Sequence, residues 1–553
     1  MRATNMEKTN SIARMLLAPM MALFLAVTAH AATPGITGPT FNLTAQTAFL
    51  NQPDGSSVYS WGYGCNGAPS GFAPAAITNA TCPTMQVPGP TLIVKEGQIV
   101  TITLTNNLPT AAGNTSILFP GFQVCLGSVS SVGVCSAPTS PNGVTGLLTQ
   151  EAAPGGTVTY TFVASTPGTH AYYSGTQGDL QIEMGLYGAV VVLPTSITGN
   201  CTSGVAASNV AAQQHWGEAD FRLATAAYDH AKSCYDREYL FQWAEMDTNI
   251  HRQALAQVTA TTGCTSYGAP GCSLNVPTEP YHPAYFLING RSMPDDMDPN
   301  FAPEYPHQPY NGNPHMHPGE QVLIRTIGQG RWQHPFHEHG NHVRILARDG
   351  NLILSQTDST ALAGLLMFNT DTTPGQAFDG IFYWTGRGLN WDAYGHLPAA
   401  KSVSGDPNAS LPCTPDANGY NTGAPTAINY YEWCADHNKP VEANPFGDVN
   451  NGGPTTLPDP NIFTNGPWYG GTPYLGPDAS TRSAAPACSG TPAAGCTPLQ
   501  PSNIQANPGN ERGYAFMWHS HNEREITTNN VFPGGMIMMM LVDSREFVID
   551  ESN

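Results

Sequence analysis

The stretch Val100-Thr-Ile-Thr-Leu-Thr105 carries an apolar side chain at every second position. Thr157-Val-Thr-Tyr-Thr-Phe162 repeats this alternation. Because successive side chains of a β-strand point to opposite faces, both stretches predict strands with one face on a core and one face in water. Two apolar runs, Ala189-Val-Val-Val-Leu193 and Met536-Ile-Met-Met-Met-Leu541, predict strands that are buried more deeply. We therefore expect an all-β protein.

The composition agrees with that fold class. A chain of 553 residues is too long for one core, so we expect two or more domains. Only 11% of the residues are charged, while 57 are Gly and 48 are Pro, which is typical of an all-β protein with many turns and long loops. Helical periodicity is scarce, and residues 213–228 are the best helix candidate. The net charge of -20 argues against binding to nucleic acid or to anionic lipid.

The N-terminus has the pattern of an export signal. Its basic residues are Arg2, Lys8 and Arg14. Residues 15–27 form a short apolar run, and Ala29-His30-Ala31 is a small-x-small cleavage site. The alternative is an N-terminal membrane anchor, for which the run is too short. We expect a signal peptide over residues 1–31, a secreted, periplasmic or cell-surface protein, and no membrane span.

The cysteines support export. Their number is twelve, and an even count in an exported chain predicts disulfide bonds. Spacing alone leaves the connectivity open, and we expect neighbours in the chain to pair: Cys65 with Cys82, Cys125 with Cys135, Cys201 with Cys234, Cys264 with Cys272, Cys413 with Cys434, and Cys488 with Cys496. The sequence contains no CxxC, which argues against a zinc knuckle and a thioredoxin-like site.

Two copies of one β-unit can be recognised along the chain. In the front copy, Leu118-Phe-Pro-Gly121 is followed by Tyr172-Tyr-Ser-Gly175. In the back copy, His334-Pro-Phe-His-Glu-His-Gly340 is followed by Trp518-His-Ser-His521. The alignment of the copies sets the following residues opposite one another: Tyr173 and His519, Gly175 and His521, and residues 118–121 and 337–340.

Histidines gather in the back copy at a spacing that suits a metal ion. His337 and His339 flank one residue, so a strand points both imidazoles to the same face. His519-Ser520-His521 repeats the arrangement, and imidazole is a ligand of copper, zinc, iron and nickel. A single His-x-His is equally well explained as a polar patch, but two pairs in matched places favour a metal site. His315-Met316-His317 lies in a Pro- and Asn-rich loop, and we interpret it as hydrated surface rather than as a second site.

Several motifs together resemble the multicopper oxidases. They are Gln86-Val-Pro-Gly-Pro-Thr-Leu-Ile-Val-Lys-Glu-Gly97, Gly185-Leu-Tyr-Gly-Ala189, Leu287-Ile-Asn-Gly290 and His334-Pro-Phe-His-Glu-His-Gly340. The resemblance covers most of the chain after residue 31. It implies cupredoxin domains, which are Greek-key β-sandwiches, with a type 1 copper that takes electrons from the substrate. It also implies a three-copper cluster that reduces dioxygen and is held by eight histidines, four from the first domain and four from the last.

The resemblance assigns a role to each histidine of the motifs. His337 and His339 match cluster ligands, and His334 matches the type 1 ligand of the same motif. His519 and His521 match the cluster ligands of the family's His-Cys-His motif.

The sequence departs from the family at both kinds of copper site. The cysteine of His-Cys-His is Ser520 here, and a hydroxyl cannot supply the thiolate that blue copper needs. The next family histidine falls on Glu525, and Met536 lies too far along the chain to be the axial ligand. In the first domain, residues 118–121 and 172–175 lack all four cluster histidines. We therefore expect no type 1 copper.

The remaining ligands fit one ion. We expect copper, with zinc as the alternative, bound by His337, His339, His519 and His521. The expected function is that of an exported copper-binding protein with oxidoreductase activity at a reduced metal site. The alternative is a non-catalytic metal-binding or structural protein, in which self-association or a surface complex would use the scaffold. The substrate, a small molecule or a metal ion, stays open.

The expected domain organisation follows from the same motifs. A first cupredoxin-like domain without ligands covers residues 32–200, and residues 201–281 are a linker with the first strands of the second domain. The second domain covers residues 282–398 and 511–553 and contains both His-x-His motifs. Residues 399–510 are expected to be a disulfide-stapled loop insertion.

Overall fold

The structure is a computed structural model. It describes residues 33–125, 129–130, 134–135, 148–196, 201, 204–387, 415–427, 430–434, 471–474, 513–543, 545 and 548–551. The predicted signal peptide, most of the predicted loop insertion and the pair Cys488–Cys496 lie outside these residues, as does Cys413. The described part is mostly β-structure, so the prediction of an all-β fold is confirmed.

The first half of the chain forms one sandwich of two sheets. Its five-stranded sheet has the order β4-β1-β5-β9-β8, and its four-stranded sheet has the order β3-β2-β6-β7. The strands are β1 (Gly35–Thr37), β2 (Thr40–Asn51), β3 (Ser57–Cys65), β4 (Phe72–Ala73), β5 (Leu92–Lys95), β6 (Ile99–Asn106), β7 (Thr157–Val163), β8 (Gly168–Tyr173) and β9 (Tyr187–Leu193). The alternation in β6 buries Val100, Ile102 and Leu104 completely or nearly so, as the pattern predicted.

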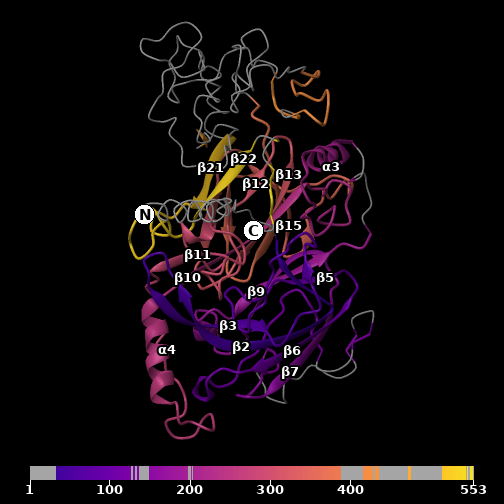
Figure 1. The fold of residues 1–553 in the computed structure, drawn as a ribbon. Coiled ribbons are helices and arrows are strands. Elements are labelled where there is room, and N and C mark those ends of the chain that lie inside the picture. The colour runs from indigo at the N-terminus through magenta and orange to yellow at the C-terminus, as the bar shows by residue number, and fades with distance from the viewer. Residues whose placement is uncertain are drawn as a thin grey trace, which may run out of the picture.

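The second half forms a larger sandwich. One sheet has the order β11-β10-β13-β19-β15-β16, with β17 beside β15, and the other has the order β12-β22-β21-β14-β18, with β20 beside β21. The strands are β10 (Arg237–Met246), β11 (Tyr285–Ile288), β12 (His315–Met316), β13 (Gln321–Gly328), β14 (His334–Glu338), β15 (Val343–Arg348), β16 (Asn351–Leu352), β17 (Leu366–Met367), β18 (Asn369–Thr372), β19 (Ala377–Tyr383), β20 (Gly471–Tyr474), β21 (Gly513–Ser520) and β22 (Ile537–Asp543). Figure 1 shows the first sandwich, in indigo and purple, next to the second, whose last strands are yellow.

The two sandwiches share one topology. In the first, β2 pairs with β6 in parallel and β6 pairs with β7 in antiparallel. In the second, β10 pairs with β13 in parallel and β13 pairs with β19 in antiparallel. The repeat read from the sequence is therefore a repeat of backbone structure as well, and β10 begins the second copy.

Five short helices accompany the strands in the described residues. They are the α-helices α2 (Gly178–Gln181), α3 (Gly204–Trp216) and α4 (Thr248–Ala260) and the short 3-10 helices η1 (Thr110–Ala112) and η3 (Asp295–Met297). The expected helix over residues 213–228 overlaps only the end of α3, so that prediction was wrong in position. Helix α4 was missed; it buries Ile250 and Ala254 in the core of the first sandwich, along whose side it runs in Figure 1.

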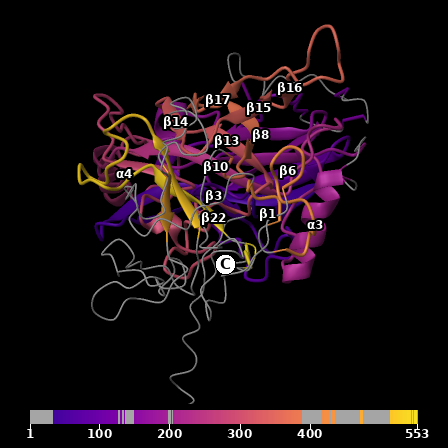
Figure 2. The same cartoon turned by 90° about the horizontal axis from the view of Figure 1, so that it is seen from above.

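The two sandwiches are packed against each other through β8. Ala171 and Ala189 of the first sandwich share an apolar cluster with Leu240 and Ile327 of the second. The hydroxyl of Thr169 also donates to Asp379 at 2.6 Å. Figure 2, which views the molecule from above, shows β8 beside β13. A contact of this kind fixes where the second sandwich lies relative to the first.

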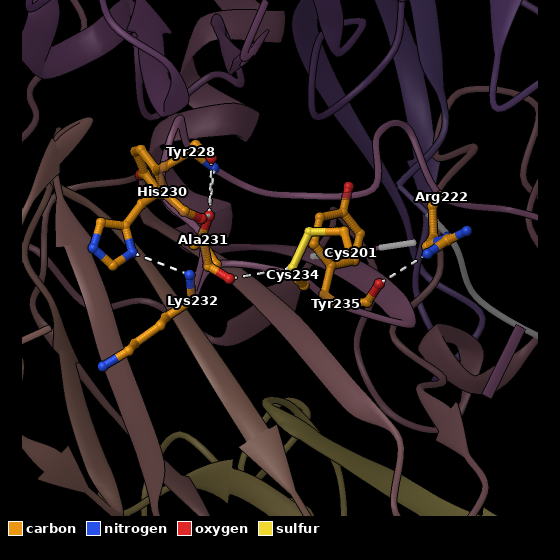
Figure 3. The surroundings of a disulfide bond; sticks show 9 residues. Cys201, Arg222, Tyr228, His230, Ala231, Lys232, Cys234 and Tyr235 are labelled. Carbon is orange, nitrogen blue, oxygen red and sulfur yellow. Dashed lines mark hydrogen bonds between the residues drawn. A yellow bond between two sulfur atoms is a disulfide. The ribbon is translucent and has the colours of Figure 1, made fainter. Parts of the chain in front are cut away.

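The described disulfides match the predicted neighbour pairs. Four bonds are formed: Cys65–Cys82, Cys125–Cys135, Cys201–Cys234 and Cys264–Cys272. Figure 3 shows the third of these, which ties the segment before α3 to the start of β10. Among the described helices, none has the length and apolarity that a membrane crossing requires.

Candidate metal centre

The two His-x-His motifs lie on neighbouring strands of the second sandwich. Strands β14 and β21 are antiparallel, and their register sets His337 directly opposite His519. Antiparallel partners point their side chains to the same face of a sheet, so the two pairs of imidazoles converge. The ring centroid of His337 lies 4.9 Å from that of His339, 5.3 Å from that of His519 and 4.7 Å from that of His521.

The distances between nitrogen atoms suit one metal ion. The Nε2 atoms of His339 and His519 are 3.2 Å apart, and His337 brings a ring nitrogen within 4.8 Å of both. Four nitrogens bound about 2.0 Å from a tetrahedral ion lie about 3.3 Å from one another. His519 also holds its Nδ1 against the carbonyl oxygen of Ser520 at 2.6 Å, which leaves Nε2 free to face the cluster. The donor set therefore fits a copper or zinc ion.

Electrostatics keep these imidazoles ready for a metal. Burial, together with the neighbouring imidazoles of His339, His519 and His521, lowers the pKa of His337 to about 4. Burial also lowers the pKa of His519. A neutral imidazole has the lone pair that a metal requires, whereas an imidazolium does not. His521 is the exposed member, so the cluster opens to the surface beside it.

His334 does not join this cluster. Its Nε2 lies 2.8 Å from Glu245 and its Nδ1 lies 2.9 Å from Glu525, so both ring nitrogens point at carboxylates. The ring is fully buried, and although burial itself opposes the charge, the hydrogen bonds to both glutamates raise the pKa of His334 to about 9. The residue that the resemblance assigned to a type 1 copper is thus held as a charged imidazolium.

Hydrogen bonds join the residues that the sequence resemblance aligns with type 1 copper ligands. The hydroxyl of Ser520 donates to Oε2 of Glu525 at 2.5 Å, and the same oxygen faces His334. From the sequence we identified Ser520 and Glu525 only as departures from the family pattern. We assigned no role to Glu245. The available signal for Glu245 was a carboxylate inside the strand Leu240-Phe-Gln-Trp-Ala-Glu-Met246, because buried carboxylates are rare unless paired.

In the first sandwich, the matched positions meet in the same way, but they carry no imidazoles. Leu118 forms a bridge with Tyr173, as His337 does with His519. A hollow of about 480 Å³ lies there, lined mainly by apolar residues that include Phe119, Pro120 and Leu148. A Cβ atom at Gly175 would lie only 2.7 Å from a methyl carbon of Thr149, so this position has no room for a histidine.

His315 and His317 are buried beside carboxylates, so the interpretation as hydrated surface was wrong. His315 Nδ1 lies 2.7 Å from Asp543, and His317 Nε2 lies 2.6 Å from Glu218. His317, Glu218 and Glu320 come close enough to hold a metal, but the guanidinium of Arg237 already bridges the two glutamates at 2.5 and 2.6 Å. This group is therefore a buried salt-bridge network.

Comparison with known proteins found one family model that matches a segment of the chain. Residues 76–196 match the family model described as multicopper oxidase. The search of curated proteins found no match. Among solved structures, a multicopper oxidase named mgLAC is 15% identical over 91% of this chain and 86% of its own, with a TM-score of 0.42. A blue copper oxidase from Nitrosomonas europaea is 14% identical over 91% and 85%, with a TM-score of 0.41.

A copper nitrite reductase from the same organism is 18% identical over 63% of this chain and 85% of its own, with a TM-score of 0.36. The identities are low throughout, and the match to the family model covers residues 76–196. The resemblance to the multicopper oxidases, first read from short motifs, is confirmed for the segment 76–196.

Proposed function

We propose that this protein is an exported, copper-binding member of the multicopper oxidase type whose metal centre holds one ion between four histidines. The convergence of His337, His339 and His519, whose ligand atoms all lie within 4.8 Å of one another, carries the proposal. We assign His521 as the fourth ligand because its ring centroid lies 4.7 Å from that of His337. Copper is preferred to zinc because the family match implies copper, while the ligand set would accept either ion. Export is supported by the described disulfide bonds, which persist in oxidising compartments.

The proposed chemistry takes place at the ion itself. When bound, copper would supply one-electron redox chemistry. Ser520 provides no thiolate, and His334 is engaged by two glutamates, so no second copper is available to pass electrons on. The substrate would therefore have to reach the imidazole cluster directly, on the side where His521 is exposed.

The test is elemental analysis of the purified protein beside two variants. We expect one metal ion per chain in the wild type and none in His519→Ala. The control is His215→Ala, in which we expect one ion per chain, because His215 is an exposed residue of α3 and does not belong to the cluster. An intense blue colour would contradict the proposal, because it would require thiolate-bound copper. Equal metal contents in wild type and His519→Ala would remove the proposed centre.

A second function is favoured by the surface beside the cluster. Leu365, Leu366 and Phe368 are 69%, 55% and 42% exposed, and Phe368 packs its ring edge-to-face against His337. Apolar residues gathered on a surface are typical of protein interfaces. A non-catalytic assembly protein would therefore self-associate through this face. Sedimentation of the protein with and without Leu365→Ser and Leu366→Ser distinguishes this function: a lower mass in the double variant supports it.

A further inference from the structure

One hydrogen-bond pattern occurs at the same place in both sandwiches, but only the second carries charge. In the first sandwich, the hydroxyls of Thr115 and Ser174 donate to Oε1 of Gln181 at 2.8 and 2.7 Å. In the second, His334 and Ser520 bond to Oε2 of Glu525 at 2.9 and 2.5 Å. Thr115 and His334 each lie three residues before the bridged position, and Ser174 and Ser520 each follow the residue that pairs with it.

Comparison of the two patterns distinguishes what the fold requires from what is specific to the second sandwich. The neutral version in the first sandwich demonstrates that the fold is satisfied by Thr, Ser and Gln at these positions. The second sandwich instead buries Glu525 and His334, which are 1% and 0% exposed. Burying charged groups costs free energy unless they are paired, so a neutral arrangement would be the default for structure alone. The charged version occurs where the imidazole cluster is present.

The charged version is also longer. His334 is bonded to Glu245, whose other oxygen accepts from the hydroxyl of Tyr281 at 3.0 Å. Tyr281 also lies 2.6 Å from Glu183 of the first sandwich. Backbone N–H groups of residues 331 and 332 donate to Glu245 as well, at 2.7 and 2.9 Å. A continuous buried chain thus runs from the first sandwich to Ser520, the residue between His519 and His521.

We infer that Glu525 is the positioning residue of the metal centre: it fixes Ser520, and through Ser520 the two imidazoles of His519 and His521, in the register that faces His337. His334 and Glu245 hold Glu525 in place, and Tyr281 joins this support to the first sandwich. This inference rests on the proposed function, because it assumes that the four histidines bind one ion. Its physical content is that a charge-assisted bond, stronger than a neutral one, holds strand β21 against β14.

The test compares matched serines. Ser520→Ala removes the hydroxyl at the metal centre, and Ser174→Ala removes its equivalent in the first sandwich. Cu²⁺ is titrated into each protein, and the electron paramagnetic resonance spectrum of the loaded form is recorded. We expect a dissociation constant about 10-fold higher and an altered spectrum in Ser520→Ala and in Glu525→Gln, and a change below twofold in Ser174→Ala. Ser520→Thr, which keeps the hydroxyl, should restore both properties.

A second pair of variants tests whether Tyr281 supports the metal centre. Tyr281→Phe should raise the dissociation constant about threefold, whereas Tyr172→Phe, which loses the bond to the Pro90 carbonyl at 2.8 Å, should leave it unchanged. If Ser520→Ala and Ser174→Ala weaken Cu²⁺ binding equally, or if Glu525→Gln leaves the spectrum unaltered, the inference is overturned.

Hydrogen exchange of the metal-free protein separates this inference from the proposed function. Amides in residues 513–521 should exchange about 10-fold faster in Ser520→Ala than in wild type. In Ser174→Ala, the exchange rate of these amides should be unchanged. Wild-type protein that binds no metal would refute the proposed function alone. Exchange that is unaltered in Ser520→Ala would overturn the positioning role, whether or not metal binds. A variant that fails to fold is replaced by Glu525→Gln, whose amide has a folded precedent in Gln181.

Discussion

Leu118 and Tyr173 in the first sandwich lie in the same relation as His337 and His519 in the second. Both pairs bridge neighbouring strands, yet one borders an apolar hollow and the other a cluster of imidazoles. The backbone geometry therefore does not depend on a metal. A cupredoxin-like scaffold supplies the register, and side chains alone decide whether that register becomes a site.

The largest effect is expected when the second pair is converted into the first. His337→Leu with His519→Tyr introduces the residues of the first sandwich and removes two of the four donors. We expect Cu²⁺ affinity to fall at least 1,000-fold, about 4 kcal/mol, while the fold is kept. Isothermal titration with circular dichroism checks both. Retained affinity would show that the imidazoles of His337 and His519 are not what distinguishes the two strand pairs in metal binding.

The two networks should respond differently to alkaline pH. The folded-state pKa of His334 is about 9, above the ordinary value of about 6.5 in an unfolded chain, so its stabilisation is complete below about pH 6.5 and is lost as pH rises through 9. The loss should reach about 3 kcal/mol. The network of Thr115, Ser174 and Gln181 contains no such group. Denaturant unfolding of wild type and His334→Gln from pH 7 to pH 10 measures the difference, which should vanish in the variant.

Restoring a histidine to the first sandwich should destabilise it. Gly175→His would push its side chain against Thr149 and Leu118, whose nearest atoms lie 2.7 and 2.8 Å from the new Cβ. Overpacking of this kind costs about 2 kcal/mol. A matched substitution at an open glycine, Gly263→His, meets no atom within 4 Å and should change stability little. Thermal unfolding of both variants compares them; equal melting temperatures would contradict the packing argument.

The last expected difference concerns acid. In the metal-free protein the ring of His337 should titrate near pH 4, because burial and three neighbouring imidazoles disfavour its charge. Since the unfolded chain binds that proton near pH 6.5, His337 lowers stability as pH falls from 6.5 towards 4. Nuclear magnetic resonance of the ring protons, with exposed His215 as the reference, gives the titration. A midpoint near 6.5 for His337 would mean that the cluster is not assembled.

Sequence patterns were sufficient for strands but weak for helices. Alternation in β6 and the apolar run in β9 predicted their burial because a period of two leaves a direct trace in the sequence. Helix α4 was missed, although Asp247 caps it by accepting from the Asn249 amide at 2.8 Å. Its apolar face is narrow and is covered by the first sandwich, so its stability comes from packing rather than from its own pattern.

The residues of the candidate metal centre also divide into those with a local sequence pattern and those without one. The spacing of two local His-x-His patterns predicted His337, His339, His519 and His521 as candidate ligands. Glu245, Tyr281 and Glu183 left no such pattern, because each acts on a partner many tens of residues away, such as the 89 residues that separate Glu245 from His334.

The sequence by itself determined the strand pattern, the repeated unit, the serine at position 520 and the two His-x-His pairs. Tertiary structure alone decided that His337 faces His519, and that His334 lies between Glu245 and Glu525 rather than in the imidazole cluster. The physical reason is range: alternation and spacing are properties of neighbouring residues, whereas coordination and charge pairing depend on which distant strands the folded core brings within a few ångströms.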